Sequence, residues 1–101
     1  MNAKHSTQEL KKHLIDVCAH LVRSIVKEPD LVEIKFVDRK DQLTILVSPK
    51  DRGLVIGRGG QNLAAIESSL LLALSYLSAG KEAKPRFTDL PSLEVRAIDE
   101  A

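Results

Sequence analysis

The types and spacing of the residues in the segment Gly57-Arg58-Gly59-Gly60 are the ones in this chain best suited to bind a ligand. Three glycines in four residues leave a bare backbone that another backbone can approach closely. Arg58 adds a positive charge. The segment that follows has the pattern of a helix, whose first N–H groups are free and whose dipole is positive at that end. A bare, basic loop that opens a helix is suited to hold a phosphodiester.

Other interpretations of the polar residues have less support. No Gly-Lys-Ser/Thr follows the loop, which excludes a nucleotide-binding P-loop. Asn62 stands where a dinucleotide-binding fingerprint needs its third glycine. His13, Cys18 and His20 share one segment, but no second cluster supplies the remaining ligands of a zinc site. No nucleophile has a visible base, so we expect no metal, no cofactor and no enzymatic activity.

The composition is that of a small folded domain. The chain has 101 residues, of which 44% are hydrophobic and 29% charged, enough for one domain with a modest core. Its formal net charge of +1 leaves only local attraction for nucleic acid. Two phenylalanines and one tyrosine are too few for a base-stacking platform to be the main binding device. A single cysteine, no signal-like N-terminus and no apolar run of about 20 residues predict a cytoplasmic protein.

The hydrophobic pattern predicts a helix and a hairpin before the loop. Ser6 and Glu9 form a capping-box pattern at the start of an amphipathic helix over 7–27. The run Glu28-Pro29-Asp30 would end that helix. Alternating apolar and polar residues predict strands over 32–36 and 42–47, joined through a charged turn at 38–41.

Two helices and a last strand are predicted around and after the loop. A short helix over 51–56, with Ser48 as its cap and Pro49 at its first position, leads into the loop. A longer helix over 61–78 would end at Gly80. A loop over 81–91 then precedes a strand over 92–98.

The order of these elements predicts the topology. A crossover through two helices makes strands 42–47 and 92–98 parallel. We therefore expect an α+β fold of order α-β-β-α-α-β, with a three-stranded mixed sheet and the helices on one face. A single domain is expected over 7–98, between a flexible N-terminus at 1–6 and a C-terminal tail at 99–101.

This order, with a Gly-x-x-Gly loop between two helices, resembles a type II KH domain. The chain is similar to small stand-alone bacterial KH proteins of the KhpA type over roughly residues 8–98, and the stretch from Pro49 to Leu63 carries the most specific match. The resemblance implies binding of single-stranded RNA or DNA. Such loops clamp about four nucleotides of the backbone.

The resemblance also implies a role for each part of a binding groove. The loop would contact the sugar-phosphate backbone, with Arg58 and the N–H groups of Gly59 and Gly60 facing phosphate. Apolar side chains of both helices would pack against bases, the last strand would form the opposite wall, and two basic residues would extend the rim. The predicted RNA-binding residues are Gly57, Arg58, Gly59, Gly60, Val55, Ile56, Gln61, Asn62, Leu63, Val95, Arg96, Lys50 and Arg52.

The helix predicted over 61–78 is apolar around most of its circumference. Only one stripe of such a helix can face a three-stranded sheet. The remainder favours a partner surface, or else burial under the first helix and the loop over 81–91. A symmetric dimer is the commonest solution, and the resemblance implies a homodimer or pairing with a larger KH protein of the KhpB type.

Two hypotheses of different classes follow. The first is a non-catalytic RNA-binding protein, an RNA chaperone or post-transcriptional regulator, that captures short single-stranded RNA with its loop and an apolar groove. The second is a protein-interaction or dimerisation adaptor in which the KH fold remains and the loop is a relic. Single-stranded DNA would use the same residues as RNA, because no feature of the sequence reports on the 2′-hydroxyl.

Overall fold

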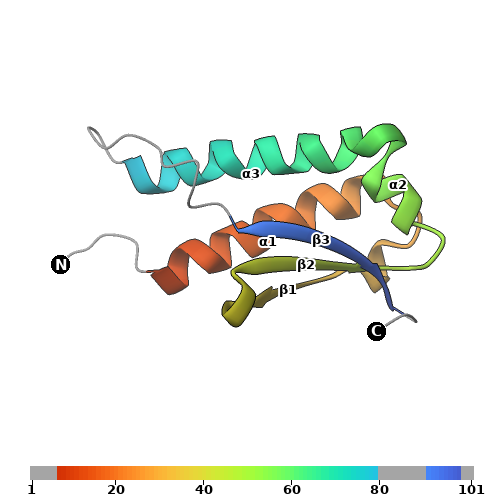
Figure 1. Ribbon diagram of the computed structural model, residues 1–101, viewed down its shortest axis with the longest axis horizontal. Helices are drawn as coiled ribbons and strands as arrows, with labels where there is room; N and C mark the ends of the chain where they lie inside the picture. The colour runs from red at the N-terminus through yellow and green to blue at the C-terminus, as the bar shows by residue number, and fades with distance from the viewer. Residues whose placement is uncertain (1–6, 80–90, 99–101) are drawn as a thin grey trace.

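Three helices cover one face of a three-stranded sheet in the computed structural model, which describes residues 7–79 and 91–98 (Figure 1). The order α-β-β-α-α-β confirms the sequence prediction. Short 3-10 turns, η1 (Pro29–Leu31), η2 (Asp38–Lys40) and η3 (Arg58–Gly60), join some of the elements. The helices and strands are α1 (Thr7–Ile25), β1 (Glu33–Val37), β2 (Gln42–Val47), α2 (Arg52–Ile56), α3 (Gln61–Ala79) and β3 (Ser92–Ala97).

The sheet is mixed, as the long crossover predicts. Its central strand, β2, pairs antiparallel with β1 and parallel with β3. The register places Ile34, Ile45 and Val95 in one row across the sheet, and this row belongs to the core under the helices. Since successive side chains of a strand alternate between faces, the next row, which begins at Lys35, lies on the open face.

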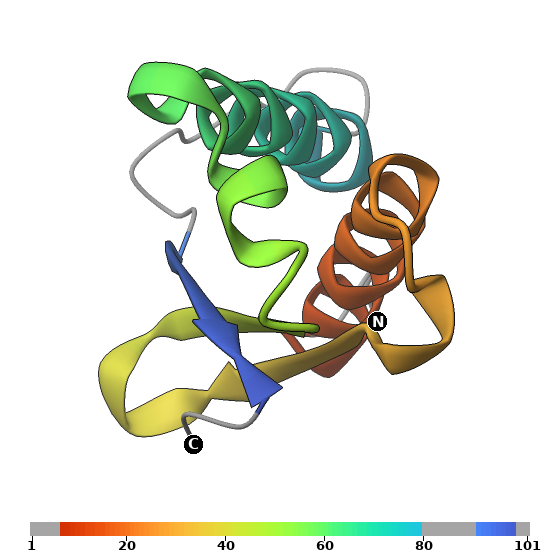
Figure 2. The same cartoon turned by 90° about the vertical axis from the view of Figure 1, so that its right-hand side faces the viewer.

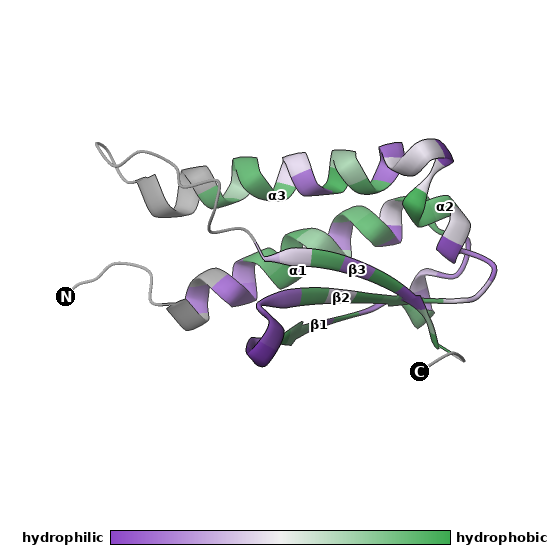
Figure 3. Cartoon of the chain, viewed as in Figure 1, coloured by the Kyte–Doolittle hydropathy of each residue, from purple (hydrophilic) through white to green (hydrophobic). Residues whose placement is uncertain are grey.

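The core fills the space between the sheet and the helices. Figure 2 shows α2 between α3 and the sheet, with α1 beside them. On α3 the buried side chains Ile66, Leu70 and Leu74 repeat every four residues and form one stripe. Much of α3 is hydrophobic in Figure 3, so this stripe accounts for only part of its apolar surface. Truncating a buried leucine such as Leu70 to alanine costs about 2–5 kcal/mol.

Some element boundaries differ from the prediction by a few residues. Helix α1 ends at Ile25, where the Val26 N–H still bonds to the Val22 carbonyl at 3.2 Å. The chain then leaves the helix before Pro29, which starts η1. The predicted charged turn is η2, which Asp41 closes in the left-handed conformation with φ 49°.

The predicted cap of the short helix is wrong. Helix α2 begins at Arg52, and Asp51 occupies the position before it. The Ser48 hydroxyl accepts a hydrogen bond from the Lys50 N–H at 3.2 Å, one turn earlier. Ser48 therefore shapes the turn that leads into α2, because its oxygen is too early in the chain to reach the first N–H groups of the helix.

Some predictions concern residues outside the described ranges. These are the cap at Ser6, the flexible segment 1–6, the helix stop at Gly80, the tail 99–101 and most of the loop over 81–91. The domain bounds 7–98 stay a prediction. Within residues 7–79 and 91–98, no helix is long and apolar enough to cross a membrane.

Candidate nucleic-acid interface

The Gly57–Gly60 loop connects α2 to α3 at one end of the molecule (Figure 1). Helix α2 ends where the Gly57 N–H bonds to the Gly53 carbonyl at 2.8 Å. Gly57 then leaves the helix with φ 79° and ψ 169°, and Gly59 adopts φ 64° in the next turn. Residues with a Cβ seldom adopt such positive φ values. The glycines are therefore needed for the shape of the loop.

Gly57 is also required by a close approach. A Cβ at this position would lie 2.8 Å from both Cγ and the backbone nitrogen of Asn62. At Gly59 and Gly60, by contrast, a Cβ would meet no atom within 4 Å. The outer side of the loop is therefore open, and another backbone can approach it there.

The backbone N–H groups of the loop divide into two pairs. Gly60 donates to the Gly57 carbonyl at 3.0 Å, and Gln61 donates to the Arg58 carbonyl. In the described part of the chain, the N–H groups of Arg58 and Gly59 have no hydrogen-bond acceptor. The resemblance implies Gly59 and Gly60 as donors to phosphate, but the Gly60 N–H is engaged inside the loop. The N–H groups open to a ligand are instead those of Arg58 and Gly59.

The charge around the loop is positive although the whole chain is nearly neutral. The stretch 52–66 contains two arginines and no acidic residue, and the first turn of α3 carries no acid. The dipole of α3 adds about half a positive charge at this end. Arg58 is exposed, so a ligand phosphate can reach its guanidinium.

Asn62 is engaged within the protein. Its side-chain Nδ2 donates to the Leu54 carbonyl at 2.7 Å and so joins the last turn of α2 to the first turn of α3. The sequence predicts that Asn62 binds RNA. In the structure its amide holds the two helices that flank the loop.

The apolar residues beside the loop differ in exposure. Val55 is fully buried in the core and supports the loop from beneath. Ile56 and Leu63 are half-buried and pack against the core from its edge. Leu54, which is not among the predicted RNA-binding residues, is 39% exposed and offers the most accessible apolar surface of α2. The available signal was its place in the apolar run Leu54-Val55-Ile56 directly before the loop.

At its free edge the last strand, β3, offers a backbone carbonyl and not the apolar Val95 side chain. The Val95 side chain is 6% exposed and belongs to the core. Its carbonyl faces the free edge of β3, where it accepts a hydrogen bond from Arg52 Nε at 3.4 Å. Arg96 is exposed and pairs with Leu46 in a row on the open face of the sheet. The structure therefore does not bring Arg96 to the face that carries the loop.

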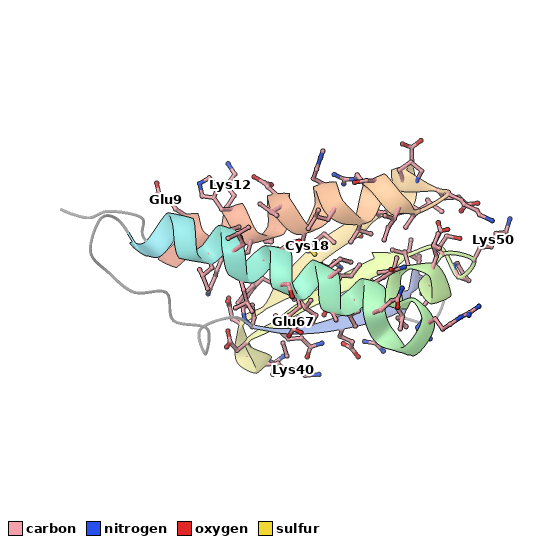
Figure 4. All side chains as sticks on the ribbon, turned by 90° about the horizontal axis from the view of Figure 1, so that it is seen from above. Glu9, Lys12, Cys18, Lys40, Lys50 and Glu67 are labelled. Atoms are coloured by element: carbon pink, nitrogen blue, oxygen red, sulfur yellow. The ribbon has the colours of Figure 1, made fainter. Side chains whose placement is uncertain are left out.

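Lys50 and Arg52 have different surroundings, although the sequence predicts that both extend the basic rim. Lys50 Nζ lies 3.9 Å from a carboxylate oxygen of Glu28, in the segment after α1. Figure 4 shows Lys50 at the outer end of the molecule. Arg52 instead bridges α2 to the edge of β3. Of the two, only Arg52 reaches from α2 to the edge of β3.

Asp51 is a structural anchor that sequence reasoning missed. Its carboxylate is completely buried and accepts hydrogen bonds from the backbone N–H groups of Lys27 and Glu28, at 3.0 Å each. These bonds tie the segment after α1 to the start of α2. The signal in the sequence was an isolated acid between the basic residues Lys50 and Arg52.

The residues weighed for metal binding or catalysis do not form a site. Among the described residues, no group of three or more His, Cys, Asp or Glu side chains is placed to hold a metal ion. Cys18 is fully buried, and burial raises the pKa of its thiol to about 12. Figure 4 shows it at the seam between α1 and α3. Cys18 is therefore a core residue.

Comparison with known proteins gives a consistent family signal. The sequence profile of the family described as "KhpA/KhpB, KH domain" matches residues 15–84, which include the loop and its flanking helices. The RNA-binding protein KhpA of Mycobacterium tuberculosis is 39% identical over 57 residues, covering 54% of this chain and 71% of that protein. The RNA-binding protein KhpA of Bacillus subtilis is 33% identical over 64 residues, covering 61% and 79%.

A solved structure shares the fold. Aquifex aeolicus Era superposes with a TM-score of 0.56 and 20% sequence identity. The match covers 88% of this chain and 32% of the Era chain, so the domain corresponds to about a third of that larger protein. At this level of identity the likeness supports the arrangement of helices and strands alone.

Proposed function

Since the chain belongs to the KhpA/KhpB family of KH domains, we propose that it binds short single-stranded RNA through the Gly57–Gly60 loop and the surface beside it. Family membership also identifies the chain as a binding protein and not an enzyme. Two relatives carry the name RNA-binding protein, which supports RNA as the ligand. The observation that supports the assignment to the loop is the pair of N–H groups, of Arg58 and Gly59, that find no acceptor among residues 7–79 and 91–98 and lie beside an exposed guanidinium.

Phosphate capture is the first step of the proposed mechanism. A phosphate oxygen accepts hydrogen bonds from the N–H groups of Arg58 and Gly59, while the Arg58 guanidinium supplies a charge-assisted contact. The open space outside Gly59 and Gly60 admits the sugar-phosphate backbone. The positive end of the α3 dipole favours the same anion.

Base packing follows from the position of the captured backbone. Bases lie over the exposed side of Leu54 and the half-buried Ile56 and Leu63. The base edges point toward the free edge of β3, where the Val95 carbonyl is an acceptor that Arg52 now occupies. Apolar packing tolerates many bases. The preference for one RNA sequence over another is therefore set mainly by contacts of the base edges with the free edge of β3.

Few phosphates are contacted, so one copy of the domain binds weakly. The net charge of +1 adds no long-range attraction. Weak binding with a short footprint suits an RNA chaperone or a post-transcriptional regulator acting in the cytoplasm. Two linked copies would bind more tightly, because the second contact becomes intramolecular.

The outer side of α3 is the proposed surface for pairing. Leu72 is 63% exposed there, the most exposed large hydrophobic side chain of the described residues. Ile25 of α1 is 38% exposed and lines a shallow apolar hollow with Ala65 of α3. A homodimer, or a heterodimer with a larger KH protein, would cover this surface. The same feature supports the alternative that the protein is mainly an interaction adaptor.

The test is binding of the wild type and of the double variant Arg58→Asp, Gly59→Asp to short single-stranded RNA and DNA across a salt series. Aspartate tolerates positive φ better than most residues, so the variant should fold, which circular dichroism checks. The matched control is Arg39→Asp, Lys40→Ala, which makes the same net charge change at η2, at the opposite end of the sheet from the loop (Figure 1).

The proposal predicts that the loop variant loses at least tenfold in RNA affinity and that the control retains most of it. The slope of log affinity against log salt should become shallower by about 0.7 for each phosphate that the variant no longer neutralises. Equal binding by the wild type and the loop variant would contradict phosphate capture at the loop. No binding by the wild type would favour the adaptor alternative. Tighter binding of DNA than of RNA would indicate single-stranded DNA as the ligand.

A further inference from the structure

We propose that Asn62 is a positioning residue that keeps the Arg58 N–H group available to a ligand. The inference rests on the proposed function of the loop and adds a residue that acts without touching the ligand. Its basis is the carbonyl that Asn62 occupies, that of Leu54.

The backbone of α2 shows which hydrogen bond Asn62 replaces. In an α-helix each N–H donates to the carbonyl four residues earlier. Val55 donates to Asp51 at 2.9 Å, and Gly57 donates to Gly53 at 2.8 Å. One step further, the Leu54 carbonyl would accept the N–H of residue 58. It accepts Asn62 Nδ2 instead, at 2.7 Å.

The same side chain also fixes the break in the helix. Asn62 Cγ and Cβ lie where a Cβ of Gly57 would come within 2.8 and 2.9 Å of them, so the amide packs directly on the Gly57 backbone. With φ 79° and ψ 169°, Gly57 turns the following N–H away from the axis of α2. Asn62 therefore satisfies the Leu54 carbonyl and occupies the space into which Gly57 would move if α2 continued.

To reach the Leu54 carbonyl from the first turn of α3, a side chain must be as long as asparagine and must carry a hydrogen-bond donor. The Leu54 carbonyl is one of the last carbonyls of α2 and needs a partner from outside the helix. The hydrogen bond is exposed, so we expect its loss to leave the domain folded. Without the amide, the carbonyl becomes free to accept the Arg58 N–H, and the loop then keeps only one of its two unpaired donors.

Amide hydrogen exchange of the full chain, measured by NMR without RNA, tests the geometry. In the wild type the Arg58 N–H should exchange near its unprotected rate, whereas the Gly57 N–H, which donates to Gly53, should be protected. In Asn62→Ala the Arg58 N–H should become protected severalfold. Asn62→Asp has the same shape as the wild-type side chain but cannot donate a hydrogen bond, so the Arg58 N–H should also become protected from exchange in this variant. An acid in the first turn favours α3. Asn62→Asp can therefore replace Asn62→Ala if the alanine variant is unstable.

RNA affinity is the second measurement. Losing one donor should weaken RNA binding by Asn62→Ala about threefold to tenfold. The matched control is Ser69→Ala, which removes the side-chain hydrogen bond from Ser69 to the Ala65 carbonyl, 3.0 Å long, further along the same helix. The control should leave both RNA affinity and Arg58 exchange at wild-type values.

The outcomes distinguish a positioning role of Asn62 from direct contact of Asn62 with RNA. Slow exchange of the Arg58 N–H in the wild type would overturn the inference without any variant. Weaker RNA binding by Asn62→Ala with unchanged Arg58 exchange would mean that Asn62 touches RNA itself, which also overturns it. If the wild type binds no RNA, the proposed function fails, while the exchange data still decide whether Asn62 controls this N–H.

Discussion

The three glycines of the loop serve different needs at the scale of single residues. All three have positive φ, with Gly60 at 80°, but only Gly57 lies against another part of the backbone. Alanine at Gly59 meets backbone strain alone, about 1–2 kcal/mol. Alanine at Gly57 adds a collision with Asn62, including its backbone nitrogen at 2.8 Å.

We therefore expect Gly57→Ala to lower the free energy of unfolding by about 3 kcal/mol or more, and Gly59→Ala by about 1–2 kcal/mol. Urea denaturation of the two variants measures the difference. Gly53→Ala is the control, because its Cβ meets no atom within 4 Å and its φ lies outside the positive range. Equal losses at Gly57 and Gly59 would show that the close approach to Asn62 is not present.

Cys18 gives a prediction about pH. Burial raises the pKa of its thiol from 9.0 to about 12, so the folded state holds the proton more tightly than the unfolded chain. This contribution to stability is complete below pH 9 and is lost as the pH rises toward 12. Between pH 8 and pH 10, the free energy of unfolding of the wild type should fall by about 1.4 kcal/mol relative to that of Cys18→Ala. Urea midpoints at the two pH values measure it, and a constant difference would contradict a buried thiol.

At the scale of elements, Asp51 links α1 to α2. Asp51→Ala leaves two backbone N–H groups, of Lys27 and Glu28, without their acceptors. Hydrogen bonds to a charged group contribute about 1.5–3 kcal/mol each, so we expect a loss of about 3 kcal/mol or more. Thermal unfolding measures it. Asp51→Asn retains one oxygen and should lose roughly half as much.

The control for Asp51 is Asp30→Ala, an exposed acid in the neighbouring turn η1. It should leave the unfolding temperature nearly unchanged, because exposed charges contribute little. Full stability of Asp51→Ala would mean that the segment after α1 is held by other contacts. In that case the start of α2, and with it the loop, would not depend on Asp51.

The sequence predicts the elements because their signals are local. Alternation along 42–47 identifies β2, and the glycines of 57–60 identify the break between two helices. The crossover rule then orients β3. None of these predictions depends on the tertiary contacts between side chains of different elements.

The partners of single side chains could not be predicted in the same way. The hydrogen bond from Asn62 to Leu54, and the burial of Asp51 under residues 27–28, depend on how α1, α2 and α3 pack. The resemblance implies that the last strand forms one wall of the groove, with both Val95 and Arg96 as candidates. The alternation of β3, with Val95 buried and Arg96 exposed, puts their side chains on opposite faces.

At the scale of the whole molecule, the exposed side of α3 predicts association. Leu72→Ser should leave the monomer stable, because the side chain is 63% exposed, and should weaken self-association at least tenfold. Analytical ultracentrifugation across a concentration series measures this. Leu31→Ser makes the same chemical change at another exposed leucine, 46% exposed in η1, and should have no effect.

If Leu72→Ser and the wild type associate equally, the pairing surface lies elsewhere. A wild type that is monomeric at all concentrations would leave a different KH protein as the partner, and the same variant would then be tested against it. Loss of association together with weaker RNA binding would support the role of avidity, because two copies share one RNA.

The Gly57–Gly60 loop is the place where we expect RNA to meet this protein. The most direct test is an NMR titration of the wild type with a single-stranded RNA of about eight nucleotides, twice the length that one KH loop clamps. We predict that the largest amide shifts occur at Arg58 and Gly59, followed by α2 and the edge of β3, and that added salt reverses them. Shifts centred on the open face of the sheet or on α1, with the loop unchanged, would contradict RNA capture at the loop.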